Sequence, residues 1–252
     1  MPVRKPPSPT IARRNAAPTD APGPQPPARG GPRPPEPVDA GTVAEIFRRF
    51  HALDPEPRGE LEHVDPYTLL VAVVLSAQST DKGVNQATRT LFPVADTPEK
   101  MIALGEEGVR GHIRSVNFHP TKARHVIALS RILIEAHGGV VPPVRAILET
   151  LPGVGRKTAS VVMNIAFREP LIAVDTHIFR VSNRIPLAIT RTPDETQEAL
   201  ERIVPEPFRL HAHHWLILHG RYVCKARKPE CWRCLIADLC RYEPKTPAPV
   251  AG

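Results

Sequence analysis

The chain has 252 residues, enough for one large domain or two small lobes. Its formal charge of +7 suits a polyanionic partner, nucleic acid or an anionic membrane surface, without choosing between them. No stretch reaches the roughly 18 uninterrupted apolar residues of a membrane-spanning helix, and the N-terminus lacks the apolar core of a signal peptide, so we expect a cytoplasmic protein.

Residues 1–40 differ in composition from the rest of the chain. They hold 13 of the 31 prolines and six Arg or Lys residues against three acids. A segment of this kind buries too little apolar surface to offset the entropy lost when it orders. We therefore expect a disordered basic arm, either a passive tail or a weak, non-specific contact to DNA.

From about Val43 onward, nearly every segment is predicted to be helical. Three pairs each combine a capping side chain with a proline at the first helical position: Asp65-Pro66, Thr97-Pro98 and Thr192-Pro193. A segment that opens at Thr121 has helical apolar spacing and should end at Gly138-Gly139 with a left-handed cap. Further helices are expected at 143–150, 156–167, 176–186, 193–203 and 207–223. No run alternates apolar and polar residues, so the expected fold class is all-α.

All four cysteines fall within 17 residues, in the spacing C-x6-C-x2-C-x5-C: Cys224, Cys231, Cys234 and Cys240. Four thiols this close, with none elsewhere, favour a four-thiolate metal site over a disulfide framework. The spacing leaves tetrahedral zinc and an iron–sulfur cube both open. Cations crowd the same loops, and we expect Lys225, Arg227 and Lys228 to contact DNA phosphates.

Residues 151–155, LPGVG, predict a tight turn between two helices. Gly153 and Gly155 remove side chains, so the backbone of the turn, Val154 included, can approach an anion beside the start of the next helix. Arg156 and Lys157 occupy the first turn of that helix, where its dipole disfavours cations. A bound phosphate would explain Arg156, and for Lys157 the same field favours the neutral, nucleophilic amine. A lysine extended into solvent is the simpler alternative.

The segment 172–177, IAVDTH, brings Asp175 to a predicted helix start after an apolar run. A capping role is the simplest interpretation, because aspartate is among the preferred N-cap residues. A carboxylate held by backbone N–H groups is also well oriented for chemistry. The two roles are compatible.

Taken together, these motifs resemble the endonuclease III family of DNA glycosylases. The resemblance spans roughly residues 43–243 and is carried by LSAQSTD (75–81), LPGVGRKTA (151–159), IAVDTHIFRV (172–181), HHWLILHGRYVC (213–224) and the four cysteines. It implies a six-helix barrel lobe at 59–169, with a helix–hairpin–helix at about 143–167. It also implies a second lobe, formed by 41–58 and 170–243, that holds a [4Fe–4S] cluster. Residues 244–252 would be a C-terminal tail.

The resemblance implies a base excision repair enzyme that is both a DNA glycosylase and an AP lyase. Lys157 would attack C1′ of a flipped-out nucleotide and form a Schiff base, and Asp175 would assist it and stabilise positive charge on the sugar. The strand would then be cut 3′ to the abasic site by β-elimination. The implied substrate is an oxidised pyrimidine of the thymine glycol type in double-stranded DNA. We expect a monomer, associated with the bacterial nucleoid and with no membrane partner.

Two further residues are expected to probe the duplex. Gln78 matches the residue that fills the gap left by the flipped base, and Phe118 stands where a well-known bacterial relative has a leucine wedge. This departure leaves the preference for particular lesions open. A pyrimidine-dimer glycosylase of the same superfamily and a non-catalytic iron–sulfur DNA sensor are the alternatives; the adenine glycosylase branch lacks a lysine at position 157.

Overall fold

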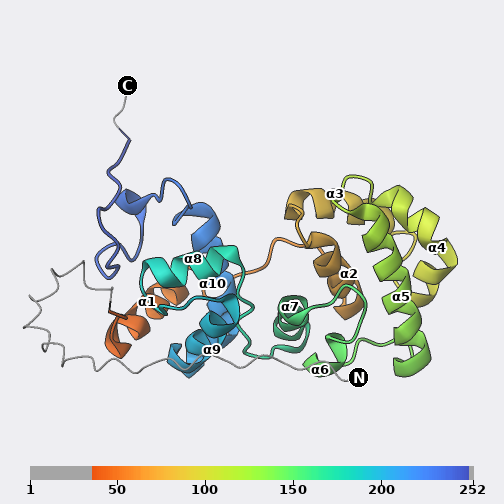
Figure 1. Ribbon diagram of the computed structural model, residues 1–252, viewed down its shortest axis with the longest axis horizontal. Helices are drawn as coiled ribbons and strands as arrows, with labels where there is room; N and C mark the ends of the chain where they lie inside the picture. Colours follow the sequence, from red (N-terminus) through yellow and green to blue (C-terminus); the bar gives the residue numbers. More distant parts are fainter. Residues whose placement is uncertain (1–35, 250–252) are drawn as a thin grey trace, which may run out of the picture. The chain divides into compact units, whose positions relative to one another are not determined.

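The computed structural model describes residues 36–249 of the chain. Within this range all regular structure is helical, as predicted (Figure 1). The expected disordered arm falls almost entirely outside the described residues. The helices are α1 (Ala40–Leu53), α2 (Pro66–Ser76), α3 (Asp81–Leu91), α4 (Pro98–His112), α5 (His119–His137), α6 (Arg145–Leu148), α7 (Arg156–Phe167), α8 (Thr176–Arg184), α9 (Pro193–Ile203) and α10 (Arg209–Tyr222), with short 3-10 turns at Glu206–Phe208 and Cys231–Arg233.

The three proline-marked helix starts are confirmed. Asp65 caps α2 in a capping box with Thr68, and Thr97 and Thr192 accept hydrogen bonds from backbone N–H groups of α4 and α9. Helices α7 and α9 have the predicted bounds, and Gly138 ends α5 with φ 61°. The helix expected at 143–150 is shorter, because α6 covers only Arg145–Leu148.

Helix α5 begins at His119 rather than at the predicted Thr121. Pro120 lies in the first turn of the helix, where the missing backbone N–H would have no partner in any case. The residue before the helix, Phe118, adopts a left-handed conformation with φ 57° and provides no side-chain cap. The prediction was wrong because it gave the start to a threonine and overlooked the proline one position earlier.

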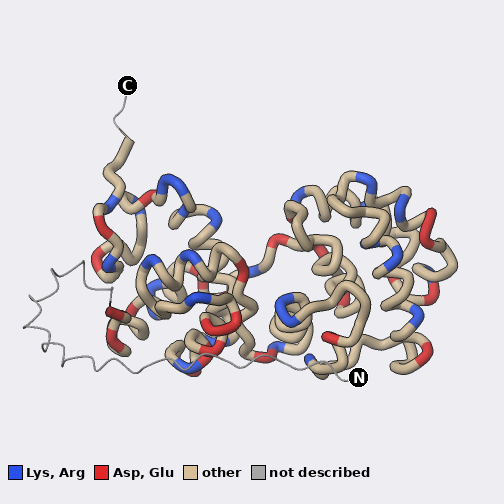
Figure 2. Tube along the Cα trace, viewed as in Figure 1, with Lys and Arg blue, Asp and Glu red and all other residues tan. Residues whose placement is uncertain are grey.

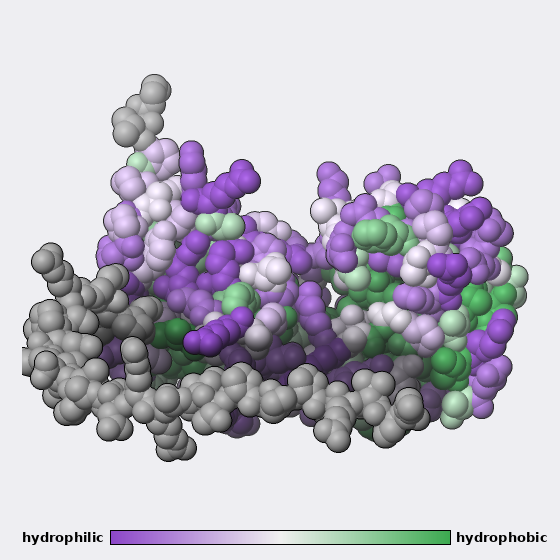
Figure 3. Space-filling view, viewed as in Figure 1, coloured by the Kyte–Doolittle hydropathy of each residue, from purple (hydrophilic) through white to green (hydrophobic). Residues whose placement is uncertain are grey.

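Buried apolar side chains form two separate cores. The first draws on six helices, α2 to α7, and the second on α1, α8, α9 and α10. Helix α2 is apolar on nearly every face and is buried from Tyr67 to Leu75, so it has to be enclosed by other helices. In Figure 3, apolar patches show between hydrophilic residues on the lobe that contains α4 and α5. No helix in the described range is both long and apolar enough to cross a membrane.

The chain crosses between the two cores twice, once after α1 and once between α7 and α8. Figure 1 shows α1 next to α8, and the buried Phe47 of α1 belongs to the same core as Ile178 of α8. Val38 is also buried in this core, so ordered packing begins before α1. This division of buried side chains supports the proposed lobes; their boundaries remain a prediction.

Helices α8 and α10 approach each other closely at Gly220. A Cβ atom on Gly220 would lie 2.9 Å from the His177 Cβ and 3.3 Å from the His177 carbonyl oxygen. Because the carbonyl is backbone, it cannot yield without moving α8. The glycine therefore sets the separation of the helix that begins beside Asp175 and the helix that leads to the cysteines.

Replacing Gly220 with alanine should force these helices apart and lower the free energy of unfolding by about 1–3 kcal/mol. Gly111 in α4 is a matched control, since a Cβ there would meet nothing within 4 Å. Gly111→Ala should raise stability by about 0.5–1 kcal/mol, because alanine is the better helix former. Urea unfolding of both variants tests this, and equal stabilities would show that the contact at Gly220 is not tight.

Candidate active site and metal centre

A pocket of about 170 Å³ is lined by residues of both lobes. The segment after α2 contributes Gln78 and the first residue of α3, Asp81, to this pocket. Helix α7 contributes Lys157, and α10 contributes His213 and Arg221. Three of the sequence motifs, far apart along the chain, therefore meet in one place.

Lys157 is an exposed side chain in the first turn of α7 and lines this pocket. Among residues 36–249 no carboxylate forms an ion pair with it. The N-cap of α7 is Gly155, which has no side chain to cap the helix, so the first N–H groups of α7 are uncapped. Lys157 thus lies in the positive field at the start of a helix and forms no ion pair within the described residues.

The turn before α7 needs a glycine at position 153. Gly153 has φ 79°, and a Cβ there would lie 2.7 Å from Nδ1 of His125. The Val154 side chain is buried and its N–H donates to the Leu151 carbonyl at 3.0 Å, so that amide is already engaged. Gly155 is open, since a Cβ there would meet nothing within 4 Å. An anion at this turn would therefore meet Gly155 and the start of α7.

The basic side chains expected to contact phosphates differ in whether a carboxylate of the protein already pairs with them. Arg156 lies 3.8 Å from carboxylates of Asp194 and Glu198 on α9, which sequence reasoning did not foresee. Lys225 pairs with Glu230 at 2.6 Å. No ion pair or hydrogen bond is found within the described chain for the side chains of Arg227 and Lys228, which are exposed. Figure 2 shows several Lys and Arg residues close together in the segment after α10.

Asp175 caps α8, as expected: its Oδ1 accepts the N–H of Ile178 at 2.8 Å. The carboxylate is partly buried and is not among the residues lining the Lys157 pocket. His177, two residues further on, lines an adjoining hollow that shares Asp81 and Arg221 with that pocket. Through His177, the first turn of α8 therefore borders the hollow beside the Lys157 pocket.

Gln78 and Phe118 share an uncommon backbone conformation. Their φ angles are 55° and 57°, in the left-handed region that non-glycine residues rarely adopt. Gln78 lines the pocket, whereas Phe118 is 62% exposed on the neighbouring loop before α5. The Asn117 side chain donates to the Gln78 carbonyl at 2.6 Å and so connects the two loops.

A charged network between the lobes was missed by sequence reasoning. Arg221 of α10 pairs with Glu60 and with Asp81, and the Tyr222 hydroxyl donates to Glu60. Both carboxylates and the guanidinium line the pocket. Asp81 and Arg221 lie in the segments LSAQSTD and HHWLILHGRYVC, but no local pattern indicates that residues 140 positions apart form a pair.

Two adjacent histidines of α10 line the pocket in neutral form. Burial, together with smaller effects of the neighbouring His214 and Lys157, lowers the pKa of His213 to about 3. Burial likewise lowers the pKa of His214 to about 4. Nδ1 of each ring has no hydrogen-bond partner among the described residues. The pocket therefore presents uncharged imidazoles next to Lys157, and sequence reasoning assigned them no role.

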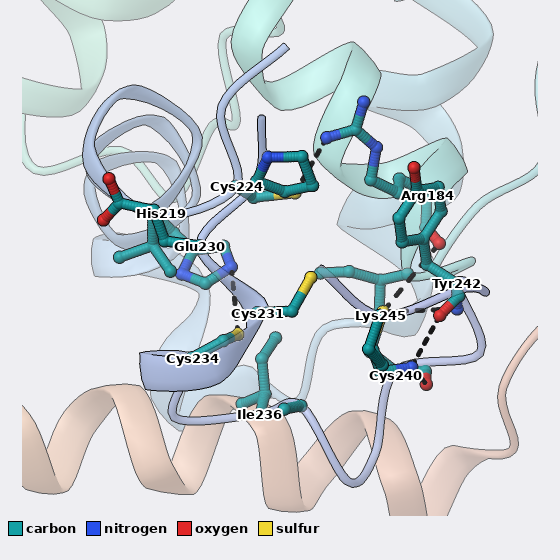
Figure 4. A pocket seen from close by; sticks show the side chains of 14 residues that line it. Arg184, His219, Cys224, Glu230, Cys231, Cys234, Ile236, Cys240, Tyr242 and Lys245 are labelled. Atoms are coloured by element: carbon teal, nitrogen blue, oxygen red, sulfur yellow. Dashed lines mark hydrogen bonds between the residues drawn. The ribbon is translucent and has the colours of Figure 1, made fainter. Parts of the chain in front are cut away.

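The four cysteines line one cavity, together with apolar residues such as Ile185 and Ile236 (Figure 4). No three Cys, His, Asp or Glu side chains in the described chain converge on a point as the ligands of a single metal ion do. Thiols arranged around a cavity fit a larger group, because an iron–sulfur cube holds its ligands apart on separate irons. The donor set and its arrangement thus fit a [4Fe–4S] cluster better than zinc.

Donor groups surround the sulfurs. Arg184 donates to Cys224 Sγ at 3.6 Å, the Tyr242 N–H to Cys240 Sγ at 3.5 Å, and His219 Nε2 lies 3.8 Å from Cys234 Sγ (Figure 4). Hydrogen bonds to the sulfurs are a feature of iron–sulfur ligation. Burial raises the pKa of the Cys234 thiol to about 11, so a bound cation is needed to hold this sulfur as a thiolate.

Two family models match the chain. Residues 71–206 match the HhH-GPD superfamily of base excision DNA repair proteins, and residues 224–240 match the iron–sulfur binding domain of endonuclease III. The second match spans all four cysteines. The first covers the pocket lysine, the turn before it and the start of α8.

Named relatives match about four fifths of the chain. Endonuclease III of Treponema pallidum is 54% identical over 203 residues, which are 81% of this chain and 96% of the relative. Endonuclease III of Escherichia coli is 53% identical over 201 residues, 80% of this chain and 95% of the relative. Among solved structures, a trapped covalent endonuclease III–DNA intermediate matches with a TM-score of 0.76 and 40% identity over 81% of this chain and 96% of that one.

The buried histidines predict a pH dependence of stability. Their folded pKa values lie below the ordinary value of 6.5, so the unfolded chain binds more protons as the pH falls. Their contribution is fully present above about pH 6.5 and is lost as the pH falls towards 4, by up to about 1.4 kcal/mol per pH unit for each histidine.

Thermal melting between pH 7 and pH 4.5 tests this, because most paired carboxylates titrate below this range. His214→Gln should flatten the dependence. His137→Gln, at the end of α5, is the control and should leave it unchanged. Identical pH profiles for all three proteins would rule out His214 as a source of the dependence.

Proposed function

Because the chain belongs to the endonuclease III family of base excision DNA repair enzymes, we propose that it removes oxidised pyrimidines of the thymine glycol type from double-stranded DNA. It is a DNA glycosylase and AP lyase and carries an iron–sulfur cluster. The observation that carries the proposed excision is the position of Lys157, which forms no ion pair within the described residues, in a pocket lined by both lobes. A damaged base must leave the stack before its sugar C1′ can be reached, and this pocket is where it would go.

Lys157 is proposed as the nucleophile. Its neutral Nζ attacks C1′, the N-glycosidic bond breaks, and the electron pair leaves with the base, which takes up a proton. The sugar ring opens to give a Schiff base between Lys157 and C1′. Loss of a proton from C2′ then expels the 3′ phosphate by β-elimination. The uncapped start of α7 supports this role, since a positive field favours the neutral amine.

Asp175 is proposed as the carboxylate that assists Lys157. Because Oδ1 accepts the Ile178 N–H, the orientation of the group is fixed, and Oδ2 has no hydrogen-bond partner among the described residues. A fixed negative charge at the edge of the cleft stabilises positive charge as it develops on the sugar. In this proposal one carboxylate has two roles: it caps the start of α8 and stabilises the positive charge on the sugar.

DNA binding is proposed to use three surfaces. Gly153, Val154 and Gly155 form the turn that faces a backbone phosphate, with Arg156 beside it. Gln78 enters the space left by the flipped nucleotide, and Phe118 wedges into the base stack. Lys225, Arg227 and Lys228 contact phosphates from the loop after α10. We propose that one copy of the chain suffices and that it works on the bacterial nucleoid.

Cys224, Cys231, Cys234 and Cys240 are proposed as the ligands of the [4Fe–4S] cluster. When bound, the cluster cross-links the loop after α10 and supplies no step of base excision. Arg180 and Arg184 of α8 donate to backbone carbonyls of this loop, at Cys224 and at Lys225. The ligands and these arginines together fix the loop that presents the basic residues.

Lys157→Gln should abolish covalent trapping. With borohydride, the wild-type protein should form a covalent complex with duplexes containing thymine glycol or an abasic site, since reduction fixes the Schiff base. The variant should form none while retaining DNA binding. Lys100→Gln, an exposed lysine of α4, is the control and should trap normally. Strand cleavage by Lys157→Gln at the wild-type rate would refute the mechanism, and excision of a cyclobutane dimer but not thymine glycol would refute the substrate.

Asp175→Asn should slow base excision by about 100-fold or more while preserving the fold. Asparagine caps a helix as well as aspartate does, so α8 keeps its first turn and only the charge is lost. Single-turnover excision and thermal melting, measured side by side, separate the two roles. A large fall in melting temperature with a proportionate fall in rate would leave only the capping role.

The purified protein should be brown and contain about four irons per chain. Replacing Cys231 with serine should lower the iron content and release the loop after α10. The measurements are iron and zinc analysis of anaerobically prepared protein and its visible absorption spectrum. Stoichiometric zinc with no iron would contradict the assignment of the ligands to a [4Fe–4S] cluster.

A further inference from the structure

Lys122 is a buried lysine that no step of the proposed reaction uses. It belongs to the first turn of α5, and only 5% of its surface is exposed. Its Nζ donates to the carbonyls of Leu75 and Ala77 at 2.7 and 2.5 Å and to Ser79 Oγ at 3.1 Å. An ammonium has three donors, and all three are engaged.

The partners of Lys122 lie at the end of α2, immediately around Gln78. The last carbonyls of a helix lack partners within it, and a left-handed glycine commonly helps to satisfy them. Here the left-handed residue is Gln78, with φ 55°, and no glycine is present. The Lys122 ammonium takes over this function and also lies at the negative end of the helix dipole.

The same lysine is bonded to the second loop. Its backbone N–H donates to the Phe118 carbonyl at 3.0 Å, which closes the first turn of α5 behind the left-handed Phe118. Asn117 completes the connection, because its N–H donates to Ser79 Oγ at 3.1 Å and its side chain to the Gln78 carbonyl at 2.6 Å. The buried ammonium therefore holds the segment around Gln78 from the first turn of α5, and Asn117, next to Phe118, joins the two loops directly.

We propose that Lys122 is a positioning residue that holds Gln78 and Phe118 together as a single rigid unit for insertion into the duplex. Strained backbone conformations persist only where the surroundings enforce them, and they cluster at functional sites. Burial lowers the pKa of Lys122 to about 8, and its charge is balanced by carbonyl dipoles rather than by a carboxylate. This inference rests on the proposed insertion of Gln78 and Phe118 into DNA.

The Lys122→Met variant tests the proposal, since methionine resembles the lysine side chain in length and lacks the ammonium. Insertion is needed only where a nucleotide must leave a duplex. Single-turnover excision of thymine glycol from a duplex should therefore fall by about 10- to 100-fold. Cleavage of a single-stranded abasic oligonucleotide, which reports the Lys157 chemistry alone, should keep its wild-type rate.

Tyr67→Phe is the matched control. It removes another buried polar contact of the same lobe, between the Tyr67 hydroxyl and Ser130 Oγ at 2.6 Å, away from both loops. It should lower the melting temperature and affect duplex and single-stranded substrates equally. Asn117→Ala should show the pattern of Lys122→Met to a smaller extent, because it breaks only the direct connection between the loops.

Fluorescence of 2-aminopurine opposite a tetrahydrofuran abasic analogue measures insertion without chemistry. Wild-type protein should raise the fluorescence and Lys122→Met should not. An equal rise in both, normal duplex excision by Lys122→Met, or equal losses on duplex and single strand would each overturn the proposal. Failure of the wild-type protein on every substrate would count against the proposed function instead; the fluorescence comparison still decides the role of Lys122.

Discussion

Two apolar cores are enclosed by a single chain that crosses between them twice. Helix α2 requires the first core, because it is apolar on nearly every face and has to be surrounded. Helix α1 joins α8, α9 and α10 in the second, although most of the chain lies between them in sequence. Side chains far apart in the sequence therefore line one pocket: Gln78 after α2, Lys157 at the start of α7 and His213 of α10 are examples.

Helix termini provide most of the electrostatics of the cleft. At each helix end, backbone N–H or C=O groups lack partners within the helix. These groups can stabilise a charged side chain or ligand without an oppositely charged residue. The start of α7 is left uncapped beside Lys157, the start of α8 is capped by Asp175, and the end of α2 is satisfied by Lys122. The Arg221 network and the pairing of Arg156 with Asp194 and Glu198 rely instead on charged side chains that meet across the lobes.

The sequence was informative where the signal is local. A Thr or Asp followed by proline correctly located the starts of α2, α4 and α9, because capping and the fixed φ of proline act within one turn. The all-α class followed from apolar periodicity. The start of α5 was missed because Pro120 outweighs the capping capacity of Thr121.

Interactions between distant segments could not be predicted in this way. The Lys122 ammonium meets residues more than 40 positions earlier, and nothing in the local sequence distinguishes it from a surface lysine. The pairing of Arg156 with acids of α9 was missed for the same reason. The four cysteines stood out by spacing, but only their arrangement around a cavity favours a cube over a single ion.

The pairing of cations with carboxylates has a consequence for how the protein would respond to ionic strength. A free lysine or arginine that meets a phosphate releases a condensed counterion from DNA, which makes binding weaken steeply with added salt. Arg156 and Lys225 already have carboxylate neighbours, whereas Arg227 and Lys228 have none among the described residues. When Arg156 or Lys225 leaves its carboxylate partner to bind a DNA phosphate, the freed carboxylate attracts cations from solution. This uptake offsets part of the counterion release from DNA. If these residues contact DNA as proposed, we expect the salt sensitivity of binding to be smaller than the number of basic residues involved would suggest.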